Sequence, residues 1–137
     1  MIKPAPKGLG LKNPIIGWKK TVVWNDVTKK NDTILVMLQI LGAHTINARD
    51  DGMPTRKRRT SKALVLAQFH LDREHTWEGV RWEIGDMFFG KSKSLHDSRF
   101  TYRTGQLVHP TKPFSLSNNA CAPGIHYFEN VDDAIHY

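Results

Sequence analysis

Cysteine is nearly absent from the 137-residue sequence, and this absence removes several possibilities. The one cysteine, Cys121, can form no disulfide within the chain, so nothing indicates an oxidising compartment. Long apolar runs are also lacking, because the longest, Ile34 to Leu41, is interrupted by Gln39 and is far too short to span a bilayer. No apolar run follows the start at Met1 to Pro4, so we expect no signal peptide and a soluble, cytosolic protein.

Motifs of several enzyme classes are missing as well. The sequence contains no phosphate-binding glycine loop of the Walker type and no Gly-x-Ser-x-Gly elbow. Its seven histidines are scattered, and His70 and His75 lie in a charged stretch that is typical of a turn rather than a zinc site. A thiol nucleophile at Cys121 would need an oriented base such as His126, and nothing fixes that geometry. We therefore expect no metal, no cofactor and no catalysis, with Cys121 as a small core residue.

The remaining composition is that of an ordinary folded domain. Apolar residues make up 39% of the chain and charged residues 24%, values close to the globular average that argue against general disorder. A chain of 137 residues is expected to form one domain, because chains divide only when a single core stops growing. Residues 1–14 hold three prolines among lysines and glycines, which predicts an extended arm. The globular domain is then expected over residues 15–137.

Strand-forming residues recur throughout that domain. We expect strands, some of them broken by turns, within residues 18–24, 34–41, 62–69, 77–84 and 100–109. The run 34–41 follows a turn signal at Asn31–Asp32 and is apolar enough for a strand covered on both faces. Residues 62–69 are a second central strand, although their Leu and Ala also favour a helix. Gly105 predicts a turn or bulge, and polar residues 91–98 predict a loop or a short helix.

The C-terminal segment has the clearest local pattern. Pro123 and Gly124 predict a turn, and Ile125 to Phe128 a four-residue strand. Asn130 can then cap a short helix whose first turn contains the acidic residues 132–133. The predicted fold class is therefore α+β, as a single strand-rich domain with a mixed or antiparallel sheet and a few short helices, one of them at the C-terminus.

Positive charge is the strongest functional signal. The net charge is +7 and the isoelectric point about 9.7, which favours an anionic partner such as a nucleic acid, a nucleotide, a membrane surface or an acidic protein. Five of the seven residues from Arg56 to Lys62 are cationic: Arg56, Lys57, Arg58, Arg59 and Lys62. Arginine forks bind phosphate oxygens, and neighbouring hydroxyls add hydrogen bonds. A solvated basic loop and a targeting patch are the alternatives.

Cations also stand beside aromatic residues. Lys19 and Lys20 follow Trp18, and Arg103 follows Tyr102. A ring can stack on a base while the cation neutralises phosphate, but ordinary strands with outward cations and inward rings give the same pattern. The candidate ligand-binding residues are Lys19, Lys20, Arg56, Lys57, Arg58, Arg59, Lys62, Tyr102, Arg103 and His126. A pocket lined jointly by Lys19, Arg59, Tyr102 and His126 is the arrangement that this hypothesis requires.

Several segments together carry a family resemblance. They are Gly17–Lys20, Lys57–Leu66, Phe100–Gly105, the closing motif Cys121-Ala122-Pro123-Gly124-Ile125-His126-Tyr127-Phe128, and Asp133, Ala134 and Tyr137. This pattern resembles an uncharacterised domain encoded by large DNA viruses and bacteriophages, often found beside pentapeptide repeats. The family usually has a cysteine where Arg58 stands and a tyrosine where Trp18 stands. The resemblance implies a viral or phage origin and no particular activity.

A second likeness concerns the C-terminal segment alone. Residues 124–128, followed by Ala134 and Tyr137, are similar to the Gly-Ile-Tyr-Phe…Ala…Tyr stretch of ADP-ribosyltransferases. In that family the stretch forms a strand, a turn and a helix under the nicotinamide pocket, and further strands carry a glutamate. The sequence stops at Tyr137 and lacks those strands. The likeness makes a transferase that depends on His126 one alternative function.

These observations predict a viral or phage accessory module that captures an anionic ligand without catalysis. The ligand would be a nucleotide or a nucleotide-derived signal of host defence, bound in the host-cell cytoplasm. A structural or accessory virion protein is the first alternative, and an ADP-ribosyltransferase-like enzyme is the second. Nucleic acid is the alternative ligand, and no membrane partner is expected. The sequence leaves the identity of the ligand and homo-oligomerisation open.

Overall fold

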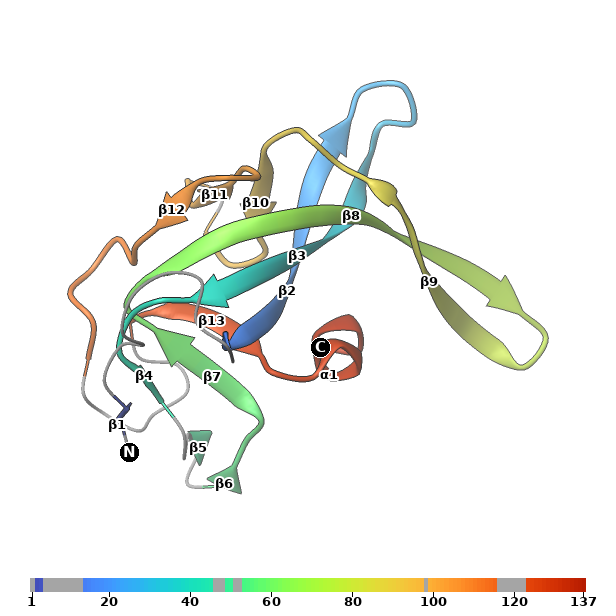
Figure 1. Cartoon of the computed structure of the whole chain (residues 1–137). Coiled ribbons are helices and arrows are strands. Elements are labelled where there is room, and N and C mark those ends of the chain that lie inside the picture. Colours follow the sequence, from blue (N-terminus) through green and yellow to red (C-terminus); the bar gives the residue numbers. More distant parts are fainter. Residues whose placement is uncertain (1, 4–13, 46–48, 51–52, 98, 116–122) are drawn as a thin grey trace.

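Antiparallel β-sheet dominates the computed structural model, which describes residues 2–3, 14–45, 49–50, 53–97, 99–115 and 123–137 (Figure 1). Its elements are β1 (Ile2–Lys3), β2 (Ile16–Asn25), β3 (Lys30–Ile40), β4 (His44–Thr45), β5 (Arg49–Asp50), β6 (Met53–Pro54), β7 (Lys57–Thr60), β8 (Ala63–Thr76), β9 (Gly79–Met87), β10 (Ser92–Ser94), β11 (Thr101–Tyr102), β12 (Leu107–Val108), β13 (Ile125–Phe128) and the helix α1 (Val131–Ile135). Eleven of the strands form one sheet, while β5 and β6 pair separately.

The long strands β2, β3, β8 and β9 form the scaffold. They pair in that order, and the main path of the sheet runs β1-β4-β7-β13-β2-β3-β8-β12. The edge of β2 opposite β3 is shared by two short strands, since Trp18 pairs with Phe128 of β13 while Thr21 and Val22 pair with β10. This sharing brings the segment after β9 and the C-terminal segment to neighbouring positions along one strand.

The sheet buries apolar side chains on both faces. On the face that we call the inner face, alternate residues of β3 from Ile34 to Ile40 pack with Tyr102, Ile125 and Tyr127. On the outer face, Leu35 and Leu71 are covered by Ala134 and Ile135 of α1. The prediction that residues 34–41 form a strand covered on both faces is therefore confirmed for β3.

Several local predictions are confirmed. Strand β13 has the predicted bounds, and Asn130 caps α1 by accepting a hydrogen bond from the backbone N–H of Asp132 at 2.8 Å. Gly105 lies in a turn with a φ of 87°, a conformation that favours glycine. Its flanking strands pair with different partners, because β11 pairs with β10 and β12 with β8.

The predicted α+β class and the mixed-sheet alternative are wrong. Every strand pair among the described residues is antiparallel, and the single helix found there has five residues. The Leu- and Ala-rich residues 62–69 enter β8, because pairing with β3 outweighs their helix propensity. Residues 91–98, predicted as a loop or short helix, contain β10, which pairs with the free part of the β2 edge. A single strand-rich domain remains the correct description of the described residues.

Two predicted turns are displaced. Asn31 and Asp32 lie inside β3, and the chain turns earlier, where the Asn25 side chain accepts hydrogen bonds from the backbone of Val27 and Thr28. The charged stretch with His70 and His75, expected as a turn, lies inside β8. The turn of the β8–β9 hairpin is formed by residues 77–78, which were expected to begin a strand, and Gly79 follows with a φ of 130°.

The expected N-terminal arm and Cys121 fall mainly outside the described residues. Within residues 1–14 the structure describes Ile2 and Lys3, which pair with Thr45 and His44, and residue 14. The expectation that Cys121 is a core residue stays a prediction. No helix among the described residues combines the length and apolarity needed to cross a membrane.

Candidate functional site

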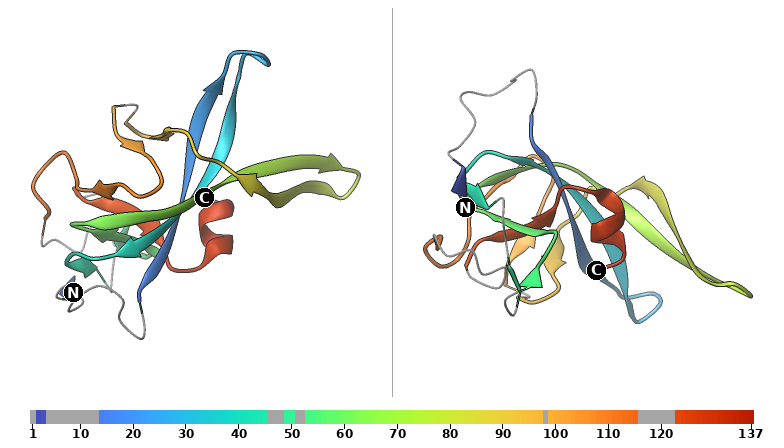
Figure 2. Two further views of the ribbon diagram at one scale, coloured as in Figure 1. Left: turned by 45° about the horizontal axis from the view of Figure 1, so that its top comes forward. Right: turned by 90° about the horizontal axis from the view of Figure 1, so that it is seen from below.

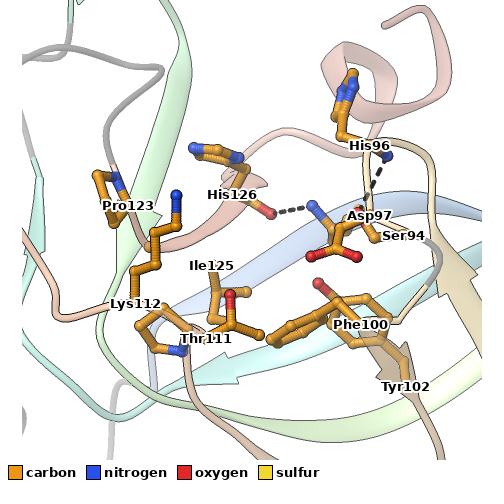
Figure 3. A pocket seen from close by; sticks show the side chains of 13 residues that line it. Ser94, His96, Asp97, Phe100, Tyr102, Thr111, Lys112, Pro123, Ile125 and His126 are labelled. Atoms are coloured by element: carbon orange, nitrogen blue, oxygen red, sulfur yellow. Dashed lines mark hydrogen bonds between the residues drawn. The ribbon is translucent and has the colours of Figure 1, made fainter.

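The inner side of the sheet opens into a cavity of about 500 Å³ between the β10–β11 segment and β13 (Figure 3). This volume lies in the range of small-molecule sites. Phe100 and Tyr102 lie on one side of the cavity, and Lys112 and Pro123 lie on the other. The full lining is Lys19, Ser94, His96, Asp97, Phe100, Tyr102, Pro110, Thr111, Lys112, Pro123, Gly124, Ile125 and His126.

Lys19 reaches this cavity from the middle of β2. Gly17, two positions earlier in the strand, lies against Tyr127 and Ile40 of the inner core. Because residues two apart in a strand point to the same face of the sheet, Lys19 also points to the inner face. The ammonium donates a hydrogen bond to the backbone oxygen of His126 at 3.0 Å and lies 5.9 Å from the centroid of the Tyr102 ring. Burial, and secondarily the charge of Lys57, lower the pKa of Lys19 from 10.5 to about 7.

Lys57 lies in a smaller space next to the cavity. This second space of about 20 Å³ shares Lys19, His96 and His126 with the main cavity and adds Lys57 and Tyr137, among others. The Lys57 ammonium donates to the Tyr137 hydroxyl at 2.8 Å and lies 4.9 Å from the centroid of that ring. Burial, followed by the charges of Lys57 and Lys19, lowers the pKa of His96.

Positive charge in this region is poorly compensated. Among the described residues neither Lys19 nor Lys57 has an ion-pair partner within 4.0 Å. Within that part of the chain Asp97 supplies the only carboxylate of the cavity lining, and it pairs with the Arg99 guanidinium at 3.2 Å. Hydrogen bonds from the Arg99 backbone and side chain lower the pKa of Asp97. The cavity is therefore a cationic environment with one carboxylate that is already engaged.

Arg59 supports the cavity wall from behind. Its side chain is fully buried, and its guanidinium donates to the backbone oxygens of Pro123 at 2.6 Å and Ser115 at 3.3 Å. The guanidinium also lies 5.2 Å from the centroid of the Phe114 ring. Because Pro123 lines the cavity, Arg59 fixes the wall, while its own charge faces backbone carbonyls.

Some of the predicted site residues lie in or beside the cavity, and the others lie elsewhere on the molecule. Lys19, Tyr102 and His126 line the cavity together, and Lys20 and Lys57 line the smaller space beside it. Arg59 completes the predicted set only indirectly, through Pro123. The structure thus brings together three of the four residues that the binding hypothesis requires in one pocket.

The other predicted residues lie elsewhere. Arg56 is exposed and pairs with Asp133 of α1 at 3.2 Å, while Arg58 donates to the backbone oxygen of Thr55. Lys62 is half-buried between β7 and β8, and Arg103 is exposed beside the turn at 103–106. The basic run is a strand with Lys57 and Arg59 buried, so the solvated-loop alternative does not describe it.

Sequence reasoning missed much of the lining. His96, Asp97, Phe100, Thr111 and Lys112 come from irregular segments around the short strands β10 and β11 and after β12. The one available signal was an aromatic residue, Phe100, in a stretch already predicted to contain strand. No group of three or more His, Cys, Asp or Glu side chains within the described residues is arranged to hold a metal ion.

Comparison with known proteins places the chain in a family. Neither the curated proteins nor the solved structures include a significant match to it. A family model covers residues 7–134, which is nearly the whole sequence, and is described as a family of unknown function, DUF5758. The resemblance to an uncharacterised domain is confirmed at this level. The protein belongs to this family of unknown function.

Proposed function

We propose that the protein binds a small anionic ligand in the cavity between the β10–β11 segment and β13. The observation that carries the proposal is Lys19, a partly buried cation in the cavity wall without a carboxylate partner among the described residues. Withdrawing a charge from water without a counterion is unfavourable. A ligand with negative charge beside Lys19 would offset that cost, and Lys112, His96 and His126 line the same space.

A nucleotide matches the remaining chemistry of the cavity. The half-buried Phe100 ring, with the buried Tyr102 ring beside it, supplies an apolar wall against which a base could lie. The two rings are themselves 5.2 Å apart between centroids and tilted by 57°, so they form one aromatic unit. A phosphate bound near Lys19 and a base near Phe100 would together occupy a volume of this size.

The biological role that we propose is accessory and non-catalytic. The resemblance to a domain of large DNA viruses and bacteriophages suggests the setting, and the cationic cavity suggests the task, which is capture of a nucleotide or of a nucleotide-derived defence signal in the host-cell cytoplasm. The alternative of a transferase that depends on His126 would use the same cavity, since His126 lines it, but no glutamate stands among the described residues of the lining.

Isothermal titration calorimetry with a ligand panel tests the proposal. The panel holds nucleoside mono-, di- and triphosphates, cyclic nucleotides, dinucleotides and inorganic phosphate. We expect at least one nucleotide to bind, and Lys19→Met to abolish the heat. Lys29→Met is the matched control, because Lys29 lies in the exposed β2–β3 turn, where it pairs with Asp26 at 3.8 Å. Silence across the panel, or equal binding by both variants, would contradict the proposal.

A salt titration separates a small ligand from a nucleic acid. A polymer releases condensed counterions when it binds, so its affinity falls steeply as salt rises. A nucleotide held in a partly enclosed cavity is screened less. We expect the affinity of the best nucleotide to change weakly with salt, and a steep, length-dependent loss with oligonucleotides would assign the site to nucleic acid instead.

A further inference from the structure

The β8–β9 hairpin projects from the sheet as a two-stranded ribbon (Figure 2). Its chemistry differs from that of the rest of the molecule, because residues 72–86 hold five carboxylates and two arginines in a protein of net charge +7. Within the described residues β9 pairs with β8 alone, so the other edge of β9 exposes unpaired backbone groups. An exposed edge of this kind is a template for another strand.

The hairpin register determines which residues of β9 face that open edge. Thr76 and Gly79 form the hydrogen-bonded pair that closes a two-residue turn. From there non-hydrogen-bonded and hydrogen-bonded pairs alternate, so every second residue of β9, beginning with Val80, is in a non-hydrogen-bonded pair with β8. Val80, Trp82 and Ile84 therefore direct their N–H and C=O groups away from β8. A register irregularity follows Ile84, so residues 80–84 are the regular part of the open edge.

The two faces of the same segment are chemically distinct. Val80 and Ile84 are 50% and 46% exposed and share a face with Trp82, whereas Arg81 and Glu83 lie on the opposite face. Exposed apolar residues on an open edge favour association. The acidic surroundings of the edge disfavour a nucleic acid as the partner.

We propose that a second copy of this chain pairs with the β9 edge, antiparallel and two-fold symmetric about Trp82. In this register Arg81 of each copy faces Glu83 of the other, and Val80 faces Ile84. Moving the symmetry axis by one residue would place Arg81 opposite Arg81, or Glu83 opposite Glu83. The order of charges along the strand therefore selects the register centred on Trp82, because opposite charges stabilise facing pairs and like charges destabilise them.

A like-charge pair inside the ribbon supports this arrangement. Glu83 stands directly opposite Asp72 of β8, and among the described residues neither carboxylate has an ion-pair partner. Facing like charges are unfavourable in an isolated ribbon. Arg81 of the second copy would approach Glu83 from the open edge and offset this repulsion.

Charge reversal at the two facing positions tests the proposal. Sedimentation over a range of concentrations should show that the wild-type chain dimerises. Arg81→Glu or Glu83→Arg alone replaces both attractive contacts by repulsive ones, and each should raise the dimer dissociation constant about tenfold or more. An equimolar mixture of the two variants should dimerise again, because each then supplies the charge that the other needs. Lys30→Glu, an exposed reversal outside the ribbon, is the control and should leave the dimer intact.

Circular dichroism establishes first that each variant is folded. Restored association in the mixture of folded variants, with the control unaffected, supports the register. A wild-type chain that stays monomeric at all accessible concentrations overturns the proposal. So does a mixture that remains monomeric although the wild-type chain dimerises.

Discussion

Replacing Lys19 by methionine removes a charge whose burial lowers the free energy of unfolding. In the unfolded chain this ammonium has a pKa of 10.5, and in the folded protein burial lowers the pKa to about 7. The folded state therefore binds fewer protons than the unfolded state between these values. The charge of Lys19 costs stability in full below pH 7, and the cost declines as pH rises toward 10.5.

The size of the effect follows from that difference in pKa. At about 1.4 kcal/mol per pH unit, a shift from 10.5 to about 7 corresponds to an upper bound of roughly 5 kcal/mol. Solvent reaches part of the side chain, which reduces the cost to about 2 kcal/mol. The variant also loses the hydrogen bond to the His126 oxygen, which lowers its free energy of unfolding by about 1 kcal/mol. Lys19→Met should therefore stabilise the free protein by about 1 kcal/mol at pH 6, with no gain at pH 9.

Urea unfolding of both proteins at pH 6 and pH 9 measures this difference. We expect Lys19→Met to be more stable than the wild-type protein at pH 6, to have no such advantage at pH 9, and to bind no nucleotide at either pH. A residue that lowers stability and is needed for binding shows the trade-off between stability and function that is common at ligand sites. If Lys19→Met destabilises the protein more at pH 6 than at pH 9, burial of the Lys19 ammonium does not lower the stability of the folded protein, which contradicts this prediction.

Substitutions at three further positions test the packing around the site by thermal or urea unfolding. Gly17→Ala should cost about 2 kcal/mol, because a Cβ there would lie 2.5 Å from a Tyr127 ring carbon, and a loss below about 0.5 kcal/mol would show that the ring can move. Tyr127→Phe should be neutral or stabilising by up to about 1 kcal/mol, since the buried hydroxyl has no hydrogen-bond partner among the described residues, and clear destabilisation would reveal a partner. Asn130→Ala should cost about 1 kcal/mol through loss of the α1 cap, whereas Asn130→Asp should retain most of the stability.

The strands could be predicted where one local pattern dominates. Local sequence alone predicts β3 from its continuous apolar run. It also predicts the turn, the strand and the helix cap between Pro123 and Asn130. The fold class was missed because short strands such as β10 exist only through pairing with β2, which no local pattern encodes. The same tertiary pairing made β8 a strand despite its content of helix-forming residues.

The site was predicted in part for a similar reason. Lys19, Tyr102 and His126 were candidates by residue type, and pairing of β2 with both β10 and β13 brings them to one cavity. His96 and Lys112 come from irregular segments without a recurrent pattern, so their convergence is visible only in three dimensions.

The basic run shows how burial changes the role of a charge. A sequence with five cations in seven residues predicts an exposed anion site or a solvated loop. In the structure the run pairs with β13 and β4, which buries Arg59 against backbone oxygens and Lys57 against Tyr137. The proposed anion site is lined instead by Ile125 and His126 of β13, which pair with Thr60 and Arg59 of that run, and Lys19 is its main cation.

A nuclear magnetic resonance titration of the ¹⁵N-labelled protein with the tightest-binding nucleotide of the panel would show directly whether the ligand occupies the cavity beside Lys19. We expect the amide shifts to concentrate in residues 94–97, 100–102, 110–112 and 124–126, and to vanish in Lys19→Met. The β8–β9 ribbon should remain unperturbed at a constant protein concentration. Shifts that spread over unrelated surfaces, or that persist in Lys19→Met, would contradict the assignment of the cavity as the ligand site.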